Sequence, residues 1–288
     1  MTSFQKIIKY GAIAFAIYLC FLIIGMIIFG ITAIFGITTG LEMFENRKDD
    51  VAMITKWEQE YTNITTMDIN LSVCKLAIKK GDMLKVDVSN VSDQFKCEEE
   101  ENKLKIEDKN LQKSIFDTID YKPEVTIYIP ETMGFEEVTI ETGVNETNIE
   151  YLKADKINLE MGVGKYQVDS LSAKYAKIEA GAGEANINHA NIKELKLDGG
   201  VGKLVLTSKI TKKADINSGV GKMELNLIGL PTDYKIKAET GLGNFVVNGQ
   251  KIKNNQTLGN GEATIKVDAG VGETVINFQE VENNSLAI

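Results

Sequence analysis

The side chains that could carry chemistry are few. The chain has 288 residues but only one His and three Cys. A Ser-His-Asp or Cys-His nucleophilic site would therefore have to use His189, and the surrounding residues Asn186-Ile-Asn-His-Ala offer it no partner. We interpret His189 as a turn residue. The Cys and His residues are also too few for a metal site of the usual spacing. The sequence thus predicts a protein that is not an enzyme and that holds no cofactor or metal.

Two of the cysteines fall on the inward-facing register of predicted strands. Cys74 has Leu76 and Ile78 as apolar companions, and Cys97 has Phe95. A disulfide between Cys74 and Cys97 fits an oxidising compartment outside the cell. Two separate buried thiols are the alternative, and the sequence leaves both open. Cys20 lies in a long apolar segment and is expected to be a packing residue.

Carboxylates recur at one position of a repeated phrase, two residues before a glycine. The position is occupied in turn by Glu141, Glu160, Glu179, Asp198, Asn217, Glu239 and Asp268. Stacked on neighbouring strands, these side chains could hold divalent cations or meet a basic partner. The alternative is an ordinary solvent-exposed column whose repulsion is eased by lysines two residues earlier, namely Lys177, Lys196, Lys237 and Lys266. We expect the second.

Neither the charge nor the glycine spacing indicates a nucleotide or nucleic-acid site. The net charge is −9, from 32 basic and 41 acidic side chains, which argues against an electrostatic nucleic-acid binder. No segment reads GxxxxGK[ST], and no GxGxxG lies between a strand and a helix. The glycines must therefore serve the backbone.

Those glycines mark a repeat between about residues 138 and 278. Each unit carries a Gly, a small apolar residue and usually a second Gly. The corner glycines are Gly143, Gly162, Gly164, Gly181, Gly183, Gly200, Gly202, Gly219, Gly221, Gly241, Gly243, Gly270 and Gly272. The first glycines of successive units are 19, 19, 19, 19, 22 and 29 residues apart, and such a fixed period indicates a stacked solenoid.

On both sides of each corner, apolar residues alternate with polar ones, as in a half-buried strand. One unit cannot bury its apolar face alone, so we predict an all-β, single-chain β-helix with rungs of about 19 residues. Glycine allows positive φ at the corner and close stacking of successive corners. We expect the Val, Ala or Leu between the glycines to point into the shared core.

The amino-terminal region predicts a membrane anchor. Residues 1–9 form a short basic head, and residues 10–41 contain no charged side chain, which is long enough for one transmembrane helix that is not cleaved. Residues 42–62 form a charged juxtamembrane connector. Phe44, Val51, Ile54 and Trp57 lie near helical spacing, so this connector is either an amphipathic helix or a partly ordered stalk.

The regions flanking the repeat have simpler interpretations. Residues 63–137 alternate without glycine corners, and we predict four strands there that cap one end of the solenoid. These strands are expected around Leu76, Leu84, Leu104 and Val125. Residues 279–288 form a polar tail.

The recurring "GVGK" and "GAGE" corners, the unit "KADKINLEMGVGKYQVDSL" and the segments "IKKGDMLKV" and "YKPEVTIYIP" carry a family resemblance. They resemble the bacterial putative-adhesin β-strand-repeat family, a domain of unknown function, over roughly residues 63–278. The family is related to the toast-rack domains of Lia-type envelope-stress proteins. The resemblance implies a β-helix exposed beyond the membrane and brings no catalytic residues. Asn145 departs from the corner pattern, where the other units have a second glycine.

We therefore expect a single-pass cell-membrane protein whose repeat domain is extracellular and binds an envelope protein or polymer without catalysis. One alternative is a regulator of envelope-stress signalling that contacts another membrane protein. Another is a membrane-tethered structural polymer similar to bactofilins. The sequence does not determine the oligomeric state.

Overall fold

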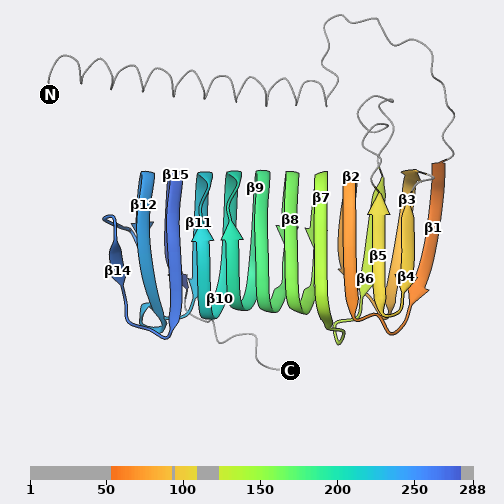
Figure 1. Cartoon of the computed structure of the whole chain (residues 1–288), viewed down its shortest axis with the longest axis horizontal. Coiled ribbons are helices and arrows are strands. Elements are labelled where there is room, and N and C mark those ends of the chain that lie inside the picture. Colours follow the sequence, from red (N-terminus) through yellow and green to blue (C-terminus); the bar gives the residue numbers. More distant parts are fainter. Residues whose placement is uncertain (1–52, 93–94, 109–122, 280–288) are drawn as a thin grey trace, which may run out of the picture. The chain divides into compact units, whose positions relative to one another are not determined.

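Strands arranged side by side make up the structure, a computed structural model that describes residues 53–92, 95–108 and 123–279 (Figure 1). These residues form one sheet of 15 strands, with a single 3-10 turn as the other regular element among them. They all belong to one compact unit of the chain. The predicted all-β solenoid is thus confirmed for this part of the protein.

The strands are β1 Met53–Tyr61, β2 Thr66–Lys80, β3 Leu84–Ser92, β4 Lys96–Glu100, β5 Lys103–Asp108, β6 Glu124–Ile129, β7 Phe135–Ile149, β8 Leu152–Val168, β9 Leu171–Asp198, β10 Val201–Asn217, β11 Val220–Ile228, β12 Tyr234–Val247, β13 Gln250–Lys251, β14 Gln256–Leu258 and β15 Ala263–Gln279, with the 3-10 turn η1 at Pro231–Asp233. Many are longer than ordinary strands because hydrogen bonding continues through the corner. β9, with 28 residues, continues from one repeat unit into the next.

The repeat units stack in parallel and in register. Val144 on β7 is level with Val163 on β8, which is level with Ala182 on β9. Along each arm the alternating apolar residues are buried, as Ile157, Leu159 and Met161 are on β8. Equivalent positions of successive units therefore form columns, and the inward columns make one continuous core.

The last two units do not stack in chain order. The sheet runs β10-β11-β15-β12, so the unit around Gly270 lies between the units around Gly219 and Gly241. The longer interval of 29 residues before Gly270 contains β13, β14 and the loops around them, which return along the outer side of β12. The unequal spacing thus reflects a change of direction in the stack.

The amino-terminal strands extend the stack at its other end. β2 is itself a rung, since it pairs with β7 along its length. Beyond β2 the sheet divides: the first half of β2 pairs with β5, and the second half pairs with β6. β5 continues to β4, and β6 continues through β3 to β1. All four strands predicted in this region are present.

The helical interpretation of the connector is wrong for the residues that the structure describes. Met53–Tyr61 forms β1, antiparallel to β3. Trp57 is half-buried and Tyr61 is buried, whereas Lys56 and Glu58 are exposed, so the alternation of period two outweighs the helical spacing. Phe44 and Val51 lie outside the described residues.

The predicted head and transmembrane segment lie outside the described residues, as does the predicted polar tail apart from Gln279, which ends β15. Among the residues that are described, no helix is long and apolar enough to cross a membrane.

Candidate interaction surface

The second glycine of each corner is required by both conformation and space. Gly202, for example, has a φ of 130°, and a Cβ there would overlap the carbonyl oxygen of Gly183 on the neighbouring rung. Glycine tolerates this φ and permits the close approach of the two backbones. Asn145 takes the second-glycine place on β7 without a positive φ and is buried. Cys74, level with Asn145 on β2, is buried as well.

The residue between the two glycines points outward, which corrects the expectation that it joins the core. The exposed fractions are 41% for Val163, 53% for Val201, 48% for Val220, 49% for Val271 and 77% for Leu242. Strand alternation explains the direction. Each middle residue follows the alternation of the arm after the corner. On β10, for example, Leu204 and Leu206 are buried, so Val201, an odd number of residues before them, lies on the opposite face.

These middle residues form a continuous row of aliphatic side chains, which we call the corner ridge. In spatial order it consists of Val73, Val144, Val163, Ala182, Val201, Val220, Val271 and Leu242. Each is level with the next on the adjacent strand, so neighbours lie at the inter-strand spacing of about 4.8 Å. The exposure of the ridge is greatest at its Leu242 end.

Charged columns of both signs flank the ridge. On one side, two residues after each middle residue, the column includes Glu146, Lys165, Glu184, Lys203, Lys222 and Glu273. Lys222 and Glu273 form an ion pair of 3.2 Å across adjacent strands. The column therefore has no strong excess of either sign.

On the other side lies the column of carboxylates identified in the sequence. Lys177 Nζ lies 2.6 Å from a carboxylate oxygen of Glu179 and 3.8 Å from one of Glu160, so one ammonium serves two rungs. Lys266 lies between Glu239 and Asp268 in the same manner. This geometry matches the solvent-exposed column. Within the described residues, no group of three or more His, Cys, Asp or Glu side chains could hold a metal ion.

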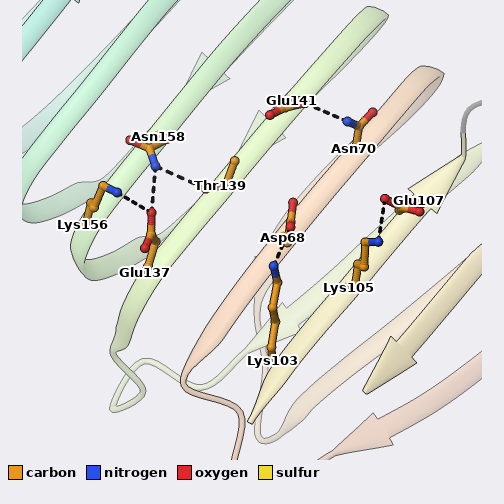
Figure 2. Close-up of polar contacts among 10 residues, drawn as sticks. All are labelled: Asp68, Asn70, Lys103, Lys105, Glu107, Glu137, Thr139, Glu141, Lys156 and Asn158. Atoms are coloured by element: carbon orange, nitrogen blue, oxygen red, sulfur yellow. Dashed lines mark hydrogen bonds and ion pairs between the residues drawn. The ribbon is translucent and has the colours of Figure 1, made fainter. Parts of the chain in front are cut away.

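Further polar contacts continue across the strands at the amino-terminal end (Figure 2). The Asn70 amide donates to Glu141 at 2.7 Å, and Lys103 pairs with Asp68 at 2.7 Å. Glu137 accepts from both Lys156 and Asn158. These contacts link β5, β2, β7 and β8, so this outer face is a network of mutually satisfied polar side chains.

The two candidate disulfide cysteines are separate thiols. Cys97 on β4 is level with Ile106, which is level with Ile69 on β2, whereas Cys74 lies further along β2. The register therefore keeps their sulfur atoms apart. The Cys97 thiol lies 3.0 Å from the Tyr61 hydroxyl. Burial raises the pKa of Cys74 to about 12 and that of Cys97 to about 11.

His189 lies in a bend within β9. Its φ is 41°, and the partner strand β10 shows a register shift opposite it. The imidazole Nδ1 is 3.3 Å from the carbonyl oxygen of Asp169. This contact gives the imidazole a backbone partner outside the neighbouring sequence.

The fold defines a β-solenoid with an outward apolar ridge, and its family follows from comparison. The toast-rack family, Toastrack DUF4097, matches residues 64–283, so the chain belongs to this family. No curated protein sequence matches the chain.

Three solved structures of similar proteins are those of a "putative cell adhesion protein" from Clostridium sporogenes, a "putative adhesin" from Bacteroides fragilis and a "putative adhesin" from Parabacteroides distasonis. The first is 19% identical, with 78% of this chain and 99% of that chain covered and a TM-score of 0.37. The second is 15% identical, with 78% and 97% covered and a TM-score of 0.42. The third is 14% identical, with 80% and 98% covered and a TM-score of 0.32.

Proposed function

We propose that this protein is a non-enzymatic binding protein of the bacterial cell envelope, held in the membrane by residues 10–41 with its toast-rack domain outside the cell. The corner ridge is the surface through which it binds. Its occupant is a protein that presents a row of apolar side chains.

The observation that carries this proposal is the exposure of large aliphatic side chains on adjacent rungs. Val201, Val220, Val271 and Leu242 lie level with one another across four neighbouring strands. A contiguous exposed apolar patch on a soluble surface marks an interaction site far more often than scattered apolar residues do. The core does not need these side chains, because other columns fill it.

The flanking charges favour a protein over a lipid surface. Binding to anionic lipid headgroups needs an excess of Lys and Arg near the apolar face. Here Lys165 and Lys203 alternate with Glu184, and the column on the other side is acidic. Mixed charges around an apolar centre are typical of the polar rim of a protein–protein interface.

Site-specific photo-crosslinking in intact cells tests the ridge. A photoreactive residue at Val201 or Val220 should give the same discrete adduct, and one at the exposed Lys209, away from the ridge, should not. Leu242→Lys and Val271→Lys together should abolish the adduct without lowering the thermal midpoint, because both side chains are exposed. Adducts of equal intensity at the ridge and at Lys209, or none at the ridge, would contradict the proposal.

Protease accessibility tests the location separately. Protease added to intact cells should cleave the toast-rack domain, and carbonate extraction should leave the full-length chain in the membrane fraction. A domain that is protected until the cells are lysed would place it inside and contradict the orientation.

A further inference from the structure

The stack of strands has three edges among the described residues, and they differ in how they are protected. An unprotected edge offers backbone N–H and C=O groups to another strand. At the β12 end the edge is covered (Figure 1). β14 pairs with Ile236–Ala238, and β13 pairs with Val246–Val247. Between them, the Asn254 side chain accepts a hydrogen bond of 2.9 Å from the Thr240 N–H.

At the other end the sheet has two edges, β4 and β1. β4 contains Glu98, Glu99 and Glu100, so pairing with a second copy of itself would bring like charges together. β1 is longer, at nine residues, and carries both signs of charge: Lys56 is basic, and Glu58 and Glu60 are acidic. No described strand pairs with its outer side.

We propose that β1 pairs with β1 of a second copy of this chain, antiparallel and centred on Trp57. In this register Lys56 lies opposite Glu58 of the second copy, and by symmetry the same contact forms twice. Lys56 has no ion-pair partner within the described part of its own chain, so its ammonium is available. Glu58 already lies 3.6 Å from Lys85, and a carboxylate accepts from two ammonium groups.

The apolar side of β1 favours the same register. Trp57 is half-buried and packs edge-on against Phe95, with ring centroids 6.4 Å apart. Both side chains lie at the end of the core, where they pack against it while remaining partly exposed. Centring the pair on Trp57 places the two indoles on adjacent strands of one face, which joins the two cores and covers this end.

Such an interface is isologous, so it closes after two subunits. Growth into a filament would need a second open end, and β13, β14 and Asn254 occupy the β12 edge. The inference therefore favours a closed dimer over an end-to-end polymer. It does not depend on the corner ridge, which lies on a different face from the β1 edge.

Disulfide trapping tests the register on the full-length protein in native membranes. In the proposed register, position 55 of one copy lies opposite position 59 of the other. The two positions 55 are separated by about 13 Å along the strand direction, and so are the two positions 59. Thr55→Cys with Gln59→Cys should therefore give a covalent dimer on mild oxidation, and either substitution alone should not. Wild-type protein controls for the native cysteines. Equal trapping by single and double variants, or no trapping by the double variant, would overturn the register.

Charge reversal tests the energetics on the purified full-length chain by analytical ultracentrifugation. Lys56→Glu should weaken the dimer about tenfold or more, because two attractive pairs become repulsive. Lys56→Glu combined with Glu58→Lys should restore most of the affinity, which general destabilisation of the fold would not do. A wild-type protein that stays monomeric up to about 100 µM, or a double reversal no better than the single one, would refute the dimer.

Discussion

At the residue scale, the second glycines of the corners combine an unusual backbone conformation with close contact between rungs. Their φ angles are 153° at Gly164, 133° at Gly183, 130° at Gly202, 125° at Gly221, 155° at Gly243 and 129° at Gly272. In the same places a Cβ would overlap the backbone of the neighbouring rung. Two separate costs would therefore follow from any substitution, and other glycines of the chain allow them to be separated.

Three glycine-to-alanine variants should separate conformation from crowding. Gly202→Ala should lower the free energy of unfolding by several kcal/mol, since it adds overlap with Gly183 to the φ penalty of about 1–2 kcal/mol. Gly249→Ala should show the φ penalty alone, because its φ is 77° and nothing lies within 4 Å of a Cβ there. Gly134→Ala should be nearly neutral, with its nearest neighbour 3.8 Å away. Urea denaturation measures all three, and equal losses would contradict this account.

The thiols of the buried Cys74 and the half-buried Cys97 should be unreactive in the folded protein. The pKa of Cys97, at about 11, is raised by burial, partly offset by its hydrogen bond with Tyr61, and that of Cys74 is about 12. At pH 8 about one thiol in a thousand or fewer would be ionised, and the thiolate is the reactive form. Mass-spectrometric mapping after iodoacetamide treatment should find both cysteines unmodified in the native protein and alkylated in urea.

The same burial makes stability depend on pH in the alkaline range. The folded state favours the neutral form of each thiol. The resulting contribution to the free energy of unfolding is complete below the unfolded-state pKa of about 8.5, and it is lost as the pH rises through the folded-state pKa values. The midpoint of urea unfolding should therefore fall between pH 9 and pH 11. A Cys97→Ser variant with an unchanged pH dependence would show that Cys97 has no part in the effect.

At the scale of single strands, the column of carboxylates before the corner is partly offset by lysines within the sheet. The pKa of Lys177 is raised, chiefly by its hydrogen bond to Glu179, and Lys266 is shared between Glu239 and Asp268. These ion pairs are exposed, so each contributes little to stability. Their effect is to reduce the repulsion between like charges on adjacent strands.

Calcium should therefore have no effect on this column. A calcium site needs several oxygens within about 2.3–2.6 Å of the ion, whereas the column spaces its carboxylates by about 4.8 Å with ammonium groups between them. Millimolar calcium should leave the thermal midpoint unchanged within error, because a ligand that does not bind cannot stabilise the fold. A rise of several degrees that Glu160→Gln with Glu179→Gln abolishes would instead establish a cation site.

At the scale of the whole sheet, the order of the last rungs makes β15 an interior strand although it is the last of the described strands in sequence. It pairs with β10 and β11 on one side and with β12 on the other. Among the described strands, β15 is the parallel neighbour through which β12 and its covering strands continue the sheet. The pairing of residues distant in sequence makes this end of the sheet depend on the carboxyl-terminal segment.

Truncation after residue 262 should consequently disrupt more than the segment it removes. Without β15, the strand β12 loses its parallel neighbour, and its buried Tyr234 and Phe245 lose their packing. Native-state hydrogen exchange should show amide protection lost over Tyr234–Val247 and kept over β7 and β8. If β12 remained protected in the truncated protein, it would have to pair directly with β11, as in a stack in chain order.

The sequence by itself determined the structure of the individual rung. The period of 19 residues, the glycine corners and the alternating arms are local signals, because each depends on residues a few positions apart. These signals were sufficient for the all-β solenoid, for the strands around Leu84 and Val125, and for the lysines that separate the carboxylates. The strand β1 was missed because Ile54 and Trp57 suit a helix as well as a strand until β3 is present to pair with them.

Only the tertiary structure decided the direction of the middle residues and the order of the rungs. Counted from the buried Leu197 before the corner, alternation would place Val201 inside. Counted from the buried Leu204 after the corner, it places Val201 outside, so the local pattern alone cannot assign the direction of this side chain. The place of β15 between β11 and β12 depends on which edge is free when the chain returns, which no local period encodes. The separation of Cys74 from Cys97 likewise follows from strand register, which is fixed by pairing across the sheet.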